Sequence, residues 1–94
     1  MPMFLVVRRF HVAMHEMPAV SRRSKQIAIE RFPDITWHHS HVVVDDAGTV
    51  NTYCVYEAPS EEIVRQHAAS YGAHDVEAVH EIAGDVTPDE FPLS

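Results

Sequence analysis

The chain has 94 residues, of which 46% are apolar and 22% are charged, proportions that are ordinary for a folded globular domain. Its 7 basic and 14 acidic residues give a formal charge of −7, which argues against nucleic acid and anionic membranes as partners, since both are bound through Lys and Arg. The length corresponds to one small domain, whose limited core would gain from pairing with a second copy.

The first expected element is a buried strand over residues 3–10, which are apolar and β-branched up to the arginines. Pro18 then suits the first turn of a helix that runs to about Phe32, because the missing N–H of proline costs nothing there. Pro33 ends this helix, since the residue before a proline avoids the α region. Its apolar face carries Met17, Val20, Ile27, Ala28 and Phe32.

Two further strands are expected over residues 35–44 and 50–57, which are rich in β-branched and aromatic residues. Between them, residues 45–48 form a turn in which Gly48 can adopt a positive φ. So short a connection predicts an antiparallel hairpin.

A second helix is expected to begin at Ser60, whose side chain caps it, and to end at Gly72. Its apolar stripe consists of Ile63, Val64, His67, Ala68 and Tyr71. A fourth strand follows over residues 76–83. We therefore divide the chain into a domain over residues 1–84 and a C-terminal tail over residues 85–94, which contains two prolines.

This order of elements, β-α-β-β-α-β, predicts an α+β fold of ferredoxin-like type. Such a fold has a four-stranded antiparallel sheet in the order 4-1-3-2, with both helices on one face. The other face should also be apolar, because the first strand is apolar on both sides and the third strand carries Tyr53 and Val55 opposite Cys54 and Tyr56. A second copy of the chain is the simplest cover for that face, so we expect a homodimer.

The sequence also indicates a compartment. Cys54 is the only cysteine, so nothing points to an oxidising environment. The apolar run near the N-terminus is shorter than the hydrophobic region of a signal peptide, and no segment reaches the roughly 18 apolar residues of a membrane-spanning helix. We therefore expect a cytoplasmic protein.

Eight histidines are unusual in so short a chain, and three of them cluster at His38, His39 and His41. On a strand, His39 and His41 point to the same face, about 6.6 Å apart. Neutral imidazole is a preferred ligand of nickel, zinc, copper and iron, so this pair predicts a divalent transition-metal site. His67 on the second helix and Glu57 at the end of the third strand are candidates to complete the ligand set.

Each of these residues also has a purely structural interpretation. His39 and His41 can simply be polar residues on a half-exposed strand or in a dimer cleft. His67 can be a core histidine, and Glu57 can be an ordinary carboxylate at the end of a strand. The four remaining histidines outside these sites, His11, His15, His74 and His80, are expected at the surface. Cys54 is expected to be a buried, inert thiol. The sequence contains no phosphate loop, G-x-S-x-G elbow or H-E-x-x-H helix, and we predict no catalytic residues.

Several segments together resemble a small bacterial family of unknown function that includes a nickel-binding, ferredoxin-like dimer. They are Phe4-Leu5-Val6-x-Arg8, Trp37-x-His39-Ser40-x-Val42, residues 52–62 (TYCVYEAPSEE) and Arg65-x-His67-Ala68. The resemblance covers roughly residues 2–83. It implies the ferredoxin-like fold, a dimer and nickel binding, with His39 and His67 at positions that match the family pattern. His38 and His41 are additions in this chain, and the first helix lacks the Thr-initiated acidic start of the family.

Our leading hypothesis is a protein that binds nickel or another divalent transition metal, with metal sequestration as its role. One alternative is a small cofactor-free enzyme of the monooxygenase or isomerase type, whose pocket between sheet and helices would be lined by His39, His67, Tyr53 and Cys54. This alternative rests on analogy between folds. Another is a non-catalytic interaction module.

Overall fold

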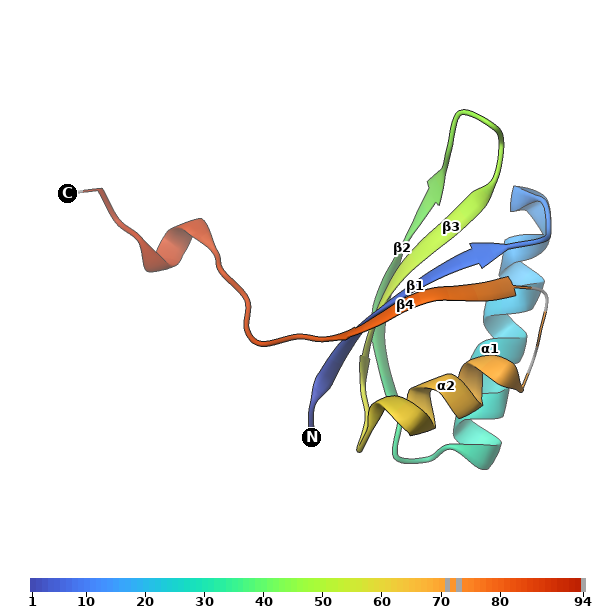
Figure 1. The fold of residues 1–94 in the computed structure, drawn as a ribbon, viewed down its shortest axis with the longest axis horizontal. Coiled ribbons are helices and arrows are strands. Elements are labelled where there is room, and N and C mark those ends of the chain that lie inside the picture. The colour runs from blue at the N-terminus through green and yellow to red at the C-terminus, as the bar shows by residue number, and fades with distance from the viewer. Residues whose placement is uncertain (71, 73, 94) are drawn as a thin grey trace.

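The computed structural model describes residues 1–70, 72 and 74–93 (Figure 1). In chain order, its elements are β1 (Met3–Phe10), the 3-10 helix η1 (Met14–Glu16), α1 (Met17–Arg31), β2 (Thr36–Val44), β3 (Val50–Glu57), α2 (Glu61–Ala69), β4 (His74–Glu81) and the 3-10 helix η2 (Pro88–Glu90). The predicted order is confirmed, although β4 starts and ends two residues earlier than expected. Tyr71, which we placed on the second helix, lies outside the described residues.

The strands form one four-stranded antiparallel sheet in the order β2-β3-β1-β4, as predicted, and the fold is of the α+β class. Both helices lie on one face of this sheet (Figure 1). None of the described helices is long and apolar enough to cross a membrane.

Alternation along the two central strands divides the sheet into a helix-covered face and an open face. On the helix-covered face, each partner pair is buried, and the pairs are Phe4–Tyr56, Val6–Cys54, Arg8–Thr52 and Phe10–Val50. The open face carries the intervening side chains Leu5, Val7, Tyr53 and Val55. It is therefore apolar at its centre, as the sequence predicted, and Tyr53 is 39% exposed.

The helices begin and pack as the sequence indicates. Pro18 lies in the first turn of α1, which buries Met17, Ser24 and Ala28 against the sheet side. The Ser60 hydroxyl accepts a hydrogen bond from the backbone N–H of Ile63 at 3.3 Å and so caps α2. Gly48 adopts a φ of 82° in the turn between β2 and β3, a conformation that favours glycine.

A β-bulge at His38 changes which side chains of β2 share a face. Trp37 pairs with Tyr56 and His39 pairs with Val55, so His38 is an extra residue on β2. Strict alternation would put Trp37 beside His39. The bulge instead puts Trp37 on the helix-covered face, where its ring stacks on Tyr56 at 6.4 Å between centroids.

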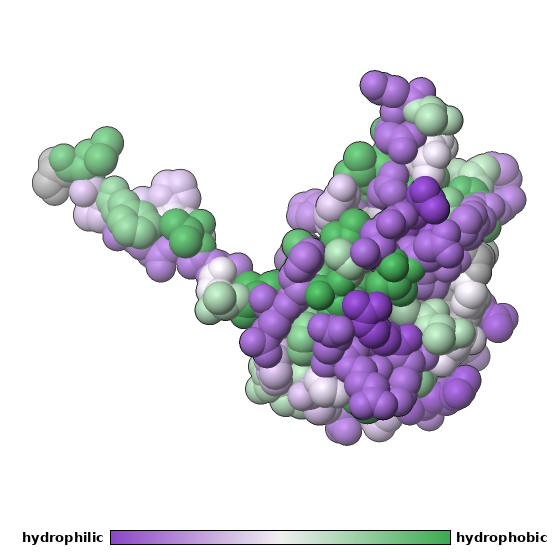
Figure 2. Space-filling model, viewed as in Figure 1, coloured by the Kyte–Doolittle hydropathy of each residue, from purple (hydrophilic) through white to green (hydrophobic). Residues whose placement is uncertain are grey.

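The C-terminal segment that follows β4 leads away from the sheet (Figure 1). Its apolar side chains Val86, Phe91 and Leu93 are exposed, and Figure 2 shows hydrophobic groups along this projecting segment. The only regular structure described in it is η2, in which Thr87 and Glu90 form a capping box.

Candidate metal site on the open face

His39 and His41 form the closest pair of predicted ligands. Both side chains are exposed on β2, and their rings lie 5.5 Å apart between centroids with an edge-to-face tilt of 79°. Their partners on β3, Val55 and Tyr53, belong to the open face. The prediction that the two imidazoles share a face is confirmed, and two imidazoles this close can approach one cation.

Glu57 lies at the end of β3 and contacts a different histidine. Its Oε1 atom is 3.2 Å from Nε2 of His38, the bulged residue, and its Oε2 atom is 3.9 Å from the N-terminal amine. Across residues 1–70, 72 and 74–93, no three His, Cys, Asp or Glu side chains gather closely enough to hold a metal. One copy of the described chain therefore presents a pair of histidines with a carboxylate at the same end of the sheet, rather than a complete ligand shell.

His67 is held on the helix-covered face and is 1% exposed. Its Nε2 atom lies 3.0 Å from the backbone carbonyl of Ser24 on α1, so Nε2 carries the donated proton in this contact. The ring also packs edge-on against Phe32 and Tyr56, at 5.6 and 5.9 Å between centroids. The sheet separates His67 from the pair on β2, and within one chain the structure does not bring these predicted ligands together.

Burial lowers the pKa of His67, since a desolvated ring resists protonation. The hydrogen bond to Ser24 opposes this effect, and the positive charge of Arg8 adds to it. The unfolded ring takes up a proton near its ordinary pKa of about 6.5, whereas the folded ring does so only at lower pH. Burial of the neutral His67 ring therefore costs the folded protein no stability above about pH 6.5. The free energy of unfolding decreases as the pH falls from there toward the pKa of the folded state, because the unfolded state takes up the proton first.

We therefore expect His67→Gln to reduce the acid sensitivity of folding. In urea unfolding, the free energy of unfolding should fall more for wild type than for the variant between about pH 7.5 and about pH 5.5. His15→Gln, a change at a histidine of η1 whose side chain is 82% exposed, should leave the acid sensitivity as in wild type. If wild type and His67→Gln lost equal free energy of unfolding over this pH range, the acid sensitivity could not be assigned to His67.

Two of the other histidines are engaged in contacts near the start of β4. His11 lies 2.8 Å from Asp75, and this hydrogen bond together with one from Arg9 lowers the pKa of Asp75. His74 is half-buried against Phe10, at 5.0 Å between ring centroids, and burial lowers its pKa. His74 is thus only partly exposed, whereas His11, His15 and His80 are exposed as expected.

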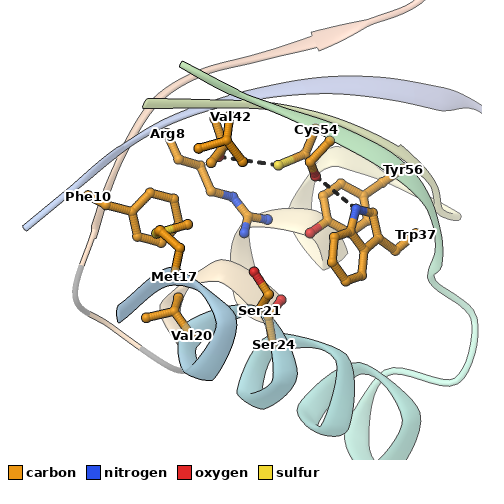
Figure 3. A pocket seen from close by; sticks show the side chains of 12 residues that line it. Arg8, Phe10, Met17, Val20, Ser21, Ser24, Trp37, Val42, Cys54 and Tyr56 are labelled. Atoms are coloured by element: carbon orange, nitrogen blue, oxygen red, sulfur yellow. Dashed lines mark hydrogen bonds between the residues drawn. The ribbon is translucent and has the colours of Figure 1, made fainter. Parts of the chain in front are cut away.

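A cavity of about 150 Å³ lies between the sheet and α1 (Figure 3). Of the four residues predicted to line an enzyme pocket at this level, only Cys54 does so. His39 and Tyr53 lie on the open face, and His67 is not among the lining residues. Cys54 is buried as predicted, and its thiol donates to the Thr52 hydroxyl at 3.3 Å.

The residue that sequence reasoning missed is Arg8, a cationic side chain that is 2% exposed and lines this cavity. A signal for it was present. Along β1, Arg8 continues the alternation of Phe4 and Val6 toward Phe10, and these positions make up the buried face of the strand. A charged residue at a core position of a regular strand marks a candidate binding site.

Comparison with models of protein families gives a match to the family described as nickel responsive protein SCO4226-like, over residues 4–82. The matched segment contains all four candidate metal ligands and all of α1, β2, β3, α2 and β4. No curated protein and no solved structure matches the chain.

Proposed function

The chain belongs to the nickel-responsive, SCO4226-like family, and we propose that it binds nickel or a similar divalent transition metal through His39 and His41. The observation that carries this proposal is the approach of two exposed imidazoles to 5.5 Å on one face of the sheet. Imidazole nitrogen is a ligand that suits nickel, copper and zinc alike. The formal charge of −7 makes the approach of a cation favourable.

Two protein ligands alone bind a metal weakly, so groups other than His39 and His41 must complete the coordination shell of the metal. We propose that water, Glu57 or a histidine of a second copy supplies the remaining ligands. Glu57 is the nearest candidate along the sheet, because it lies two residues beyond Val55 on the face that carries His39. His67 would require exposure of a buried side chain and is the least accessible of the four candidates.

A homodimer is part of this proposal. It is supported by the apolar centre of the open face and by the small size of the chain, 10.6 kDa. The β-α-β-β-α-β order and the observed strand order also support a ferredoxin-like classification. A two-fold dimer through the open face, with its axis across the strands, would place β2 of one copy over β2 of the other and bring the two His39–His41 pairs together.

The dimer is expected to depend on Tyr53, at the centre of the open face. Light scattering at micromolar concentration should give twice the chain mass for wild type and the chain mass for Tyr53→Glu, because the change buries an unpaired carboxylate in the contact. Ile29→Glu, at a 67% exposed apolar position on α1, should remain dimeric. A monomeric wild type would contradict the proposal.

We further propose that the protein sequesters the metal in the cytoplasm. A reducing compartment is supported by the single, buried cysteine.

The test of metal binding is calorimetric titration of metal-free protein with nickel, zinc and copper. Binding should weaken as the pH falls, since a ligating imidazole must be neutral. Absence of binding by all three metals would contradict the proposed function.

A further inference from the structure

The cavity between the sheet and α1 has a charged interior, although it lies within the core. Arg8 reaches into it from β1, and Figure 3 shows the guanidinium directed toward Ser21 and Ser24 of α1. The twelve residues that line the cavity include this one cation and neither Asp nor Glu. The interior of the cavity is therefore electropositive.

Polar groups surround the guanidinium on the side of Tyr56. The Cζ atom of Arg8 lies 5.2 Å from the centroid of the Tyr56 ring. Burial raises the pKa of the Tyr56 hydroxyl, and the positive charge of Arg8 and the side chain of Ser24 oppose this effect. Burial lowers the pKa of the neighbouring His67, the hydrogen bond to Ser24 opposes this effect, and the positive charge of Arg8 lowers the pKa further. A guanidinium has five N–H donors in a planar fork, so it can serve a phenol oxygen and a ligand oxygen together.

The remaining walls of the cavity are apolar. Phe10, Met17 and Val20 line one side, and Trp37 lines the other (Figure 3). Val42 on the edge strand β2 is 43% exposed, and Val20 and Ser21 on α1 are half-buried. Solvent and a small ligand therefore reach the cavity between β2 and α1.

We propose that this cavity binds a small monocarboxylic acid, with the carboxylate on the Arg8 guanidinium and the Ser21 and Ser24 hydroxyls, and the apolar body between Met17 and Trp37. A carboxylate fits because it matches the planar fork of an arginine in two parallel hydrogen bonds. A flat or short aliphatic body fits because the volume is about 150 Å³ and aromatic walls favour stacking. The site is independent of the proposed metal site, which lies across the sheet.

The test uses Trp37, the only tryptophan in the chain, as a reporter inside the site. Metal-free protein is titrated at constant ionic strength with sodium benzoate, with its uncharged isostere benzamide and with sodium chloride. Benzoate should change the Trp37 emission saturably, and benzamide should bind at least about tenfold more weakly, because it has no negative charge and offers only one acceptor oxygen to the Arg8 guanidinium. Chloride should give no saturable change.

Three variants sharpen the test. Arg8→Met should weaken benzoate binding at least about tenfold. Ser21→Leu, at a half-buried position that lines the cavity, should also weaken benzoate binding by filling the cavity, and it provides the test if Arg8→Met does not fold. His39→Ala, on the opposite face, should bind benzoate as wild type does. Equal binding of benzoate and benzamide, no saturable response to benzoate, or unchanged binding by folded Arg8→Met or by Ser21→Leu would overturn the proposal.

Discussion

Replacing both His39 and His41 by alanine is expected to weaken nickel binding by more than about a hundredfold, because loss of even the groups that support metal ligands costs about 10–100-fold. The two rings are exposed and 5.5 Å apart, so the double variant removes the paired imidazoles without disturbing the core. Calorimetric titration of the metal-free proteins measures the effect directly.

The single variants and a matched control locate the site. His39→Ala and His41→Ala should each weaken nickel binding at least about tenfold, since either change leaves one imidazole. His15→Ala removes another exposed histidine, whose side chain is 82% exposed, and should leave the affinity unchanged. If both single variants bind as tightly as wild type, the metal is bound elsewhere, and the other histidines become the candidates.

The sequence was sufficient to predict the architecture because the local signals agreed with one another. Pro18, Gly48 and Ser60 each impose a backbone conformation that marks the start of a helix or a turn. Alternating burial along β1 and β3 then fixes which face is covered. Where propensity, pattern and turn chemistry point to one answer, element order and strand order follow.

The bulge at His38 could not be predicted from alternation. A strand with one extra, bulged residue contains the same kinds of residues as a regular strand, so no local sequence pattern indicates where the bulge lies. Its effect on the candidate site is large. It leaves His39 and His41 on the open face while turning Trp37 into the cavity on the other face.

The contacts of His67 also could not be predicted from the pattern of apolar residues. The stripe on α2 correctly indicates that His67 is buried, but a stripe does not identify the group that the ring meets. That group is the Ser24 carbonyl of α1, 43 residues away in the chain. Distant contacts of this kind decide whether a buried histidine is a ligand or a structural residue.

Truncating Phe4 to alanine is expected to destabilise the protein by about 3–5 kcal/mol, the usual cost of deleting a buried aromatic ring. Phe4 is 3% exposed and packs in the main core cluster with Val6, Tyr56 and Val64. Domains of this kind are stable by only about 5–15 kcal/mol, so a single substitution removes a large share of the total. The melting temperature should fall by about 12 °C or more.

Phe91→Ala is the matched control, because it removes the same ring from a position that is 61% exposed in the C-terminal segment. It should change the free energy of unfolding by no more than about 0.5 kcal/mol. Both variants are compared with wild type by thermal and urea unfolding at one protein concentration, since association of copies makes stability depend on concentration. Similar losses in the two variants would mean that the C-terminal segment packs against apolar surface in solution, and the core at Phe4 would then not dominate the stability of the fold.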